Sequence, residues 1–336
     1  MGRELGVRYV LEGSLRQAAN RIRVTAQLVE SETGKHVWAE RYDRELADIF
    51  AVQDEITEAV TIAVAPAIAE AELQRAMRKL PDSLDAWAAY QRGLWHFDKA
   101  TVKDYALAAT FFRNAIDLDP NFADGYCGLG MVQIYVAAGF GTGGLADALS
   151  SIGPLARRAV SLDANNAIAR SCVGFAAFSC GDYQGALVEA ERALQLSPNL
   201  AAGFWQRGVT LIFDGRPEQR LTDLRTSLRL EPSGSNLVLR LFHTAIGYYF
   251  SGAYENALAA ADRTIRAFPE WPQSYRFRAA ALGQLERSEE AKAALERAIA
   301  IGPEAFDLYI RGRPSWYRPE DYAHMLEGLR KAGWPG

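Results

Sequence analysis

Five prolines recur at nearly regular intervals through the last three-quarters of this 336-residue chain. They are Pro120, Pro198, Pro232, Pro269 and Pro303. The intervals after Pro198 are 34, 37 and 34 residues, and Ala164 divides the longer interval before it into 44 and 34. A period of about 34 residues indicates stacked helix–turn–helix units, in which each unit buries its apolar face against its neighbours.

The residues between these prolines favour a helical hairpin in each unit. Gly174 is expected where two helices cross closely, and Gly181 and Asp182 are expected to form the turn between them. Pro198 then follows the second helix and prevents it from continuing. The pattern predicts a mainly α fold, an α-solenoid of about six tetratricopeptide (TPR) repeats over 81–303. Their expected ranges are 85–120, 121–164, 165–198, 199–232, 233–269 and 270–303, and a C-terminal capping segment is expected over 304–336.

Residues 1–80 have a different pattern. Three stretches that begin at Tyr9, Arg21 and His36 alternate apolar and polar residues, which predicts a small antiparallel β-meander. Three strands bury little surface alone, so the sheet needs a covering helix. A long linking helix is expected from Asp48 to about Lys79. The residues expected on the covered face of the sheet are Val10, Ile22, Val24, Ala26, Leu28, Val37 and Ala39.

Composition argues against several classes of function. The net charge is −4, from 37 Lys and Arg against 41 Asp and Glu, so no nucleic-acid partner is expected. No apolar stretch is long enough to span a membrane, and three unpatterned cysteines indicate a reducing, cytoplasmic location. Gly139, Gly141 and Gly144 fit G-x-G-x-x-G, but helical repeats flank them, so we interpret them as part of an inter-helix insertion. No catalytic residue, cofactor or metal is expected.

The first helix of each TPR unit is expected to line a concave groove through positions two, five, nine and twelve of the unit. In this chain those positions are mostly apolar and aromatic, so the expected ligand is an apolar peptide, a helix or a part of the same chain. The alternative is that these side chains only pack the superhelix or are covered by the C-terminal segment. The predicted groove residues are Tyr90, Met131, Phe175, Phe178, Trp205, Val209, Ile212, Phe242, Ile246, Tyr249 and Arg276.

Both ends of the chain resemble a family of bacterial signalling proteins. The runs Leu5–Arg16, Arg21–Val29 and His36–Arg44 resemble the end of the TolB-like domain that links class III adenylate or guanylate cyclases to C-terminal TPRs. The stretch Leu326–Pro335 resembles the tail of the same proteins. The same linker and repeats also follow winged-helix domains in some transcriptional regulators. No position here matches the metal-binding aspartates of the cyclase domain, so the resemblance implies a regulatory architecture and no catalytic residue.

These features predict a non-enzymatic TPR scaffold that acts as the regulatory or sensor part of a bacterial signalling system. Two alternatives stay open: a fragment of an adenylate or guanylate cyclase, and the C-terminal module of a winged-helix regulator. Only part of the TolB-like domain is matched, so the chain is expected to be either a shortened reading frame or a separate sensor module. An incomplete sheet would leave an unpaired edge through which two chains could associate.

Overall fold

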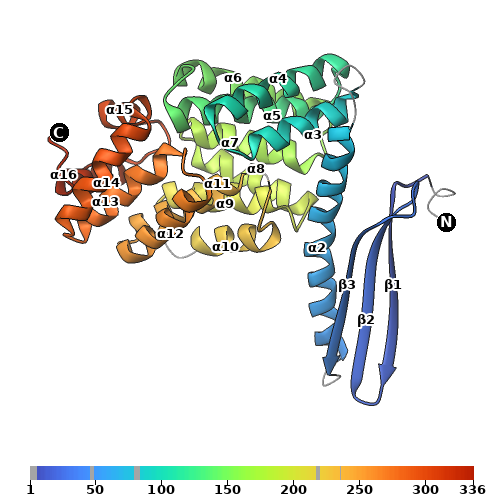
Figure 1. Ribbon diagram of the computed structural model, residues 1–336. Coiled ribbons are helices and arrows are strands. Elements are labelled where there is room, and N and C mark those ends of the chain that lie inside the picture. Colours follow the sequence, from blue (N-terminus) through green and yellow to red (C-terminus); the bar gives the residue numbers. More distant parts are fainter. Residues whose placement is uncertain (1–5, 46–48, 79–83, 217–219, 235) are drawn as a thin grey trace. The chain divides into compact units, whose positions relative to one another are not determined.

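The computed structural model describes residues 6–45, 49–78, 84–216, 220–234 and 236–336. The chain divides into two compact units, Met1–Leu80 and Pro81–Gly336. Figure 1 shows the first unit as a sheet with one long helix and the second as a stack of helices. The predicted fold class, a mainly helical solenoid preceded by a small antiparallel meander and a long helix, is confirmed.

The first unit contains strands β1 (Tyr9–Ala18), β2 (Arg21–Glu30) and β3 (His36–Glu45), paired antiparallel in the order β1-β2-β3. Helix α2 (Ile49–Arg78) follows the strands. One apolar cluster joins the helix to the sheet, and its buried members are Ile22, Ala26, Tyr42, Val52 and Ile56. Burial of these side chains supplies the cover that a three-stranded sheet lacks by itself.

The prediction that Val10, Val37 and Ala39 lie on the covered face is wrong. In β3, Trp38 and Tyr42 are the residues that pack with the buried side chains of β2. Because successive side chains along a strand point to opposite faces, Val37 and Ala39 lie on the other side of the sheet, where Ala39 is exposed. Val10 is also on that side, since it pairs with Val29, whose side chain points to the face opposite that of the buried residues of β2.

A buried carboxylate holds the start of β1 against the far end of α2. The Glu72 side chain accepts a hydrogen bond from Arg8 Nη1 at 2.6 Å and another from the Tyr9 hydroxyl at 2.8 Å. These two charge-assisted bonds fix one end of the helix on the sheet. Asp48 and Lys79, the expected limits of this helix, lie outside the described residues.

Six helical hairpins make up most of the second unit, and each lies within one predicted repeat range. The pairs are α3 (Ala86–Phe97) with α4 (Val102–Leu118), α5 (Ala123–Ile134) with α6 (Leu145–Leu162), α7 (Ala167–Ser179) with α8 (Tyr183–Leu196), α9 (Ala201–Phe213) with α10 (Arg220–Leu230), α11 (Leu237–Phe250) with α12 (Tyr254–Ala267), and α13 (Pro272–Gln284) with α14 (Ser288–Ile301). Helices α15 (Pro303–Arg311) and α16 (Pro319–Lys331) end the unit, and α16 packs on α13.

Small residues allow the paired helices to approach closely. A Cβ atom on Gly93 would lie 2.5 Å from the Phe112 ring, and one on Gly128 would lie 2.8 Å from the same ring. A Cβ on Gly174 of α7 would meet the Gln206 side chain at 2.8 Å, so the close contact at this glycine is with α9 of the next repeat, whereas the sequence predicts it with the second helix of the same hairpin. A larger side chain at these positions would push neighbouring helices apart, because the interior is close-packed.

The predicted insertion in the second repeat is partly helical. Residues Tyr135–Gly139 form a short π-helix, η2, that continues α5. A glycine-rich loop follows, in which Gly141 and Gly144 have φ angles of +74° and +76°. The described part of the chain has only the three antiparallel strands of the first unit as its sheet, so no strand precedes these glycines as a dinucleotide site requires.

Candidate partner-binding groove

All of the predicted groove residues are buried. The most exposed of them, Met131, retains 8% of its accessible surface, and Val209, Ile212 and Tyr249 retain none. They lie on the first helices of the hairpins, α3, α5, α7, α9, α11 and α13, as the repeat pattern requires. Their burial means that none of these side chains is available to a partner in this structure.

Contacts between tilted and edge-on aromatic rings account for part of this burial. The Phe175 ring lies 5.2 Å from the Trp205 ring, and Trp205 lies 5.8 Å from His243, between centroids. On the next helix, Phe242 lies 6.2 Å from Trp271. Inner positions of successive repeats thus contact one another, and each offset or edge-to-face pair adds to the energy of burial.

The insertion of the second repeat covers another part of the groove. The Gln273 side-chain amide on α13 donates to the carbonyl oxygens of Ala138 at 3.1 Å and Gly139 at 2.9 Å, across more than 130 residues of sequence. The Phe140 ring meets Trp271 edge-on at 5.2 Å. The second and sixth repeats are therefore joined directly through η2.

A C-terminal segment is the third part of the chain that covers the predicted groove. We call residues 312–318, between α15 and α16, the strap. The Ser315 hydroxyl donates to the carbonyl of Ser179 at 2.5 Å, and the Tyr183 hydroxyl donates to the carbonyl of Trp316 at 3.1 Å. The Tyr317 ring packs edge-on against Phe213 at 4.9 Å. The structure thus shows the arrangement that the sequence left open, in which a part of the same chain covers the predicted groove.

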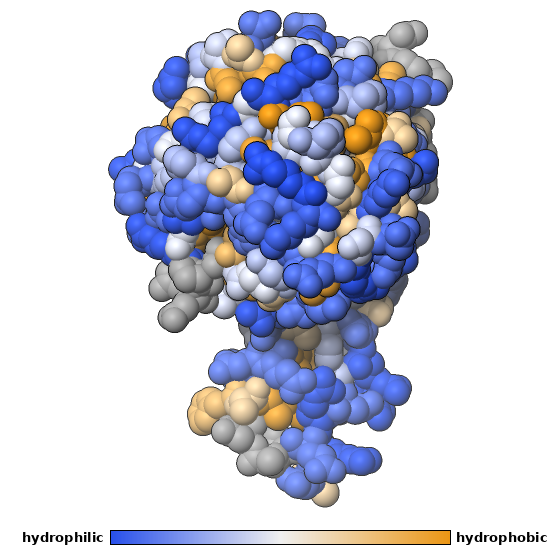
Figure 2. All heavy atoms as spheres, turned by 90° about the vertical axis from the view of Figure 1, so that its left-hand side faces the viewer, coloured by the Kyte–Doolittle hydropathy of each residue, from blue (hydrophilic) through white to orange (hydrophobic). Residues whose placement is uncertain are grey.

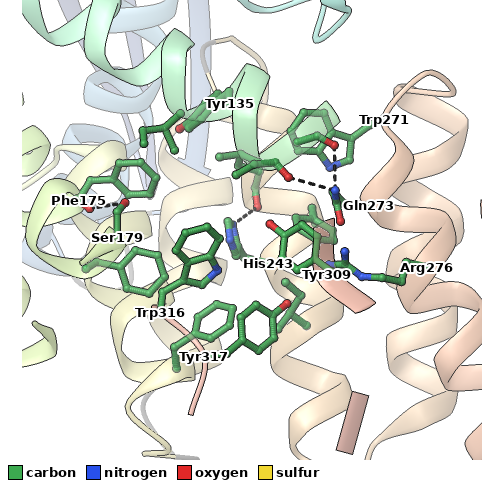
Figure 3. Close-up of a pocket in the computed structure, with 18 residues that line it drawn as sticks. Tyr135, Phe175, Ser179, His243, Trp271, Gln273, Arg276, Tyr309, Trp316 and Tyr317 are labelled. Atoms are coloured by element: carbon green, nitrogen blue, oxygen red, sulfur yellow. Dashed lines mark hydrogen bonds between the residues drawn. The ribbon is translucent and has the colours of Figure 1, made fainter. Parts of the chain in front are cut away.

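A small pocket of about 50 Å³ remains between the groove and the strap. Figure 3 shows aromatic side chains around it, with Tyr309, Trp316 and Tyr317 contributed by the C-terminal region. The predicted groove residues that line it are Phe175, Phe178, Phe242, Ile246 and Arg276. The others, Tyr90, Met131, Trp205, Val209, Ile212 and Tyr249, are buried elsewhere in the solenoid. The pocket is too small for a peptide, so a polypeptide can enter only if the strap moves.

The sequence analysis did not identify Gln273 or the aromatic residues Trp271, Tyr309, Trp316 and Tyr317 as pocket residues. The aromatic run Trp316-Tyr317 just before α16 is the one local signal that could have indicated a buried segment there. The other pocket contacts join residues that are far apart in the sequence, so no local pattern indicates them.

Burial sets the ionisation of the pocket residues. It lowers the pKa of His243 to about 4, although a backbone hydrogen bond to the Leu239 carbonyl at 2.8 Å acts in the opposite direction. It also raises the pKa of the Tyr309 and Tyr317 phenols. These three side chains are therefore neutral at pH 7, and the Arg276 guanidinium carries a positive charge.

Among the described residues, no group of three or more His, Cys, Asp and Glu side chains could hold a metal ion. In the same residues, no helix combines the length and apolar character needed to cross a bilayer.

Comparison with known proteins supports the repeat architecture. A family model of the tetratricopeptide repeat matches residues 272–304. A protein of Rhizobium meliloti (strain 1021), named as a candidate adenylate cyclase 3, is 36% identical over 166 residues, which are 48% of this chain and 28% of that protein. Superkiller complex protein 3 of Mus musculus is 29% identical over 266 residues, 78% of this chain and 15% of its own length. The chain thus spans less than a third of either relative.

A solved structure has the same fold. The crystal structure of the APC/C hetero-tetramer Cut9–Hcn1 superposes with a TM-score of 0.52 at 17% identity, covering 73% of this chain and 47% of that one. Identity at this level shows the fold alone. The helical unit therefore has a TPR-like solenoid fold, in which one hairpin matches the tetratricopeptide-repeat model.

Proposed function

We propose that this chain is a non-enzymatic scaffold that binds another polypeptide on the inner surface of its TPR solenoid. One observation carries the proposal: the inner surface already holds a polypeptide segment, the strap, through aromatic packing and hydrogen bonds to backbone carbonyls. A surface that binds its own chain in this way has the chemistry to bind a similar segment of a partner.

The proposed partner segment is apolar and aromatic. It would occupy the place of Trp316 and Tyr317 and contact Phe175, Phe178 and Phe242. Figure 2 displays the side of the helical unit on which α13 to α16 lie in Figure 1, and this side is mostly hydrophilic, with small groups of apolar side chains between the polar ones. On that face the surface offers few anchors for such a segment, which favours the inner surface.

The test uses a synthetic peptide with the sequence of residues 309–318, labelled for fluorescence anisotropy. The peptide is expected to bind a Trp316→Ala, Tyr317→Ala double variant at least about tenfold more tightly than the wild-type chain, because the variant's own strap competes less. A matched control, Trp334→Ala, removes a C-terminal tryptophan that does not line the pocket and should leave binding at the wild-type level. Absence of binding to a folded double variant would overturn the proposal.

We further propose that the partner is the catalytic part of a bacterial cyclase-type signalling protein, for which this chain serves as the regulatory or sensor part. The similarity to the Rhizobium protein supports this choice. The competing reading is that the chain itself makes cyclic nucleotides. Incubation of the purified chain with ATP and Mn²⁺ distinguishes them, since measurable cAMP formation would replace the scaffold proposal with an enzymatic one.

Self-association through the first unit is a separate proposal. Strand β1 lies at one edge of the sheet, and Leu11 and Leu15 on it are 51% and 63% exposed. An exposed strand edge with apolar side chains favours pairing with a second copy. Analytical ultracentrifugation should show a concentration-dependent dimer that Leu15→Lys weakens, and a strictly monomeric wild-type chain at high concentration would contradict it.

We propose a cytoplasmic location for the protein, because unpaired cysteines are stable in that reducing compartment.

A further inference from the structure

The most unusual group in the helical unit is the guanidinium of Arg276. Its side chain is among the largest that are fully buried, with 2% of the residue exposed. Its three nitrogens, Nε, Nη1 and Nη2, form no well-aligned hydrogen bond, and the only polar groups close enough to interact with them among the described side chains are the neutral hydroxyls of Tyr309 and Tyr317. Among the described residues, no carboxylate lies within ion-pair distance of it. A buried arginine in this condition calls for an explanation, because buried charges in proteins are normally paired.

Other arginines of the solenoid show what this one lacks. Arg240, which is 1% exposed, lies 3.0 Å from a Glu231 carboxylate oxygen and donates to the Glu231 carbonyl at 2.6 Å. Arg207 is paired with Asp223 at 2.7 Å, and Arg278, two residues from Arg276, is paired with Asp262 at 2.7 Å. The chain thus supplies carboxylates to neighbouring arginines but none to Arg276.

Water cannot compensate this charge completely. A guanidinium stays protonated in proteins, so Arg276 cannot escape the cost of burial by losing its proton. The Tyr309 ring covers one face of the guanidinium, 3.6 Å from its central carbon, and this cation–π contact offsets part of the cost. A bound water would accept a hydrogen bond from the edge but would leave the positive charge in place.

The pocket beside Arg276 has the character of an anion site. Arg276 is the one lining residue that carries a formal charge at neutral pH, since the other lining side chains are apolar, neutral polar or aromatic. Figure 3 shows its guanidinium beside Tyr309 and on the same side of the pocket as Gln273. The indole nitrogen of Trp271, buried without a partner, adds a neutral donor to the lining, and the Gln273 side-chain oxygen is an acceptor without a partner.

We propose that this pocket binds a small monocarboxylate anion, whose carboxylate accepts hydrogen bonds from the edge of the Arg276 guanidinium. The planar fork of a guanidinium matches a carboxylate, and the aromatic walls favour an occupant with a short apolar tail over a fully polar anion. The volume of about 50 Å³ accommodates an occupant of that size. Because Tyr309 and the strap residues Trp316 and Tyr317 also line the pocket, the bound anion would hold the C-terminal region on α13. This inference does not depend on the proposed polypeptide partner.

Isothermal titration calorimetry of the full chain with sodium propionate, at ionic strength held constant with sodium chloride, tests the site. The wild-type chain is expected to give saturable binding of one propionate per chain and a quenching of tryptophan fluorescence, because Trp271 and Trp316 line the pocket. Arg276→Met should weaken binding roughly tenfold or more. Arg278→Met, which removes a neighbouring arginine that is paired outside the pocket, should bind as the wild type does.

Two results would overturn the proposal. One is the absence of saturable binding to the wild-type chain at propionate concentrations up to about 10 mM. The other is equal binding to the wild-type and Arg276→Met chains, which would place the anion elsewhere. If the methionine variant does not fold, Arg276→Lys keeps the charge but loses the fork, and it should bind propionate more weakly than the wild-type chain.

Discussion

Replacing Trp205 with alanine is expected to destabilise the helical unit, because this predicted groove residue is part of the core. Trp205 retains 1% of its accessible surface and lies between Phe175, at 5.2 Å, and His243, at 5.8 Å. Truncating a tryptophan in such a position removes its transfer free energy and leaves a cavity, at a cost of about 3–5 kcal/mol. For a unit of this size, that loss corresponds to a fall in Tm of roughly 6 to 20 °C.

The assay is urea unfolding followed by far-UV circular dichroism. Val188→Ala serves as the control, because Val188 lies within helix α8 and is 47% exposed, so its truncation should change the free energy of unfolding by less than about 0.5 kcal/mol. The reasoning fails if Trp205→Ala unfolds at the wild-type midpoint and loses only the ability to bind the 309–318 peptide. That outcome would mean an open groove with Trp205 on its surface.

Two further changes probe the covered groove. Gly139→Ala should destabilise the helical unit by roughly 1–3 kcal/mol, because the added Cβ would lie 2.3 Å from the Trp271 ring. Gly312→Ala is the control, since its Cβ would meet no atom within 4 Å and the substitution should not change stability. Equal thermal midpoints for the two variants would contradict the contact between η2 and Trp271. His243, with a pKa lowered to about 4 in the folded chain, takes up a proton only in the unfolded chain between pH 6.5 and 4. Stability should therefore fall by about 3 kcal/mol as the pH falls through that range, and His243→Leu should remove this part of the pH dependence; an unchanged pH profile in the variant would exclude the histidine as its source.

The helical hairpins could be predicted because their determinants are local. Pro198 ends a helix just before it, and Gly174 permits a crossing between helices that are near in sequence. Such features repeat at the period of the unit, so the number of hairpins and their approximate ranges follow from the sequence.

The covered face of the small sheet could be predicted only in part. Alternation along a strand separates two faces but does not say which of them a helix will cover. Val37 and Ala39 are apolar, yet the larger rings of Trp38 and Tyr42 bury more surface and take the inner positions of β3.

The state of the groove could not be predicted because it depends on contacts between distant parts of the chain. The bond from Gln273 to Gly139 and the bond from Ser315 to Ser179 each join residues more than 130 positions apart. They form only after the small rotations between successive hairpins have accumulated into a superhelix. The repeat period identifies the inner residues, but nothing in it specifies what covers them.

Backbone hydrogen exchange in the strap is the most direct test of the claim that the solenoid holds its own C-terminal segment. The amide of Tyr317 is expected to exchange nearly as slowly as those of α13, because Tyr317 is 1% exposed and its amide donates to the Pro314 carbonyl at 3.0 Å. The Trp316→Ala, Tyr317→Ala variant should exchange faster in the strap while α13 stays protected. Exchange of the wild-type Tyr317 amide at the rate of an exposed loop, with α13 fully protected, would contradict the account.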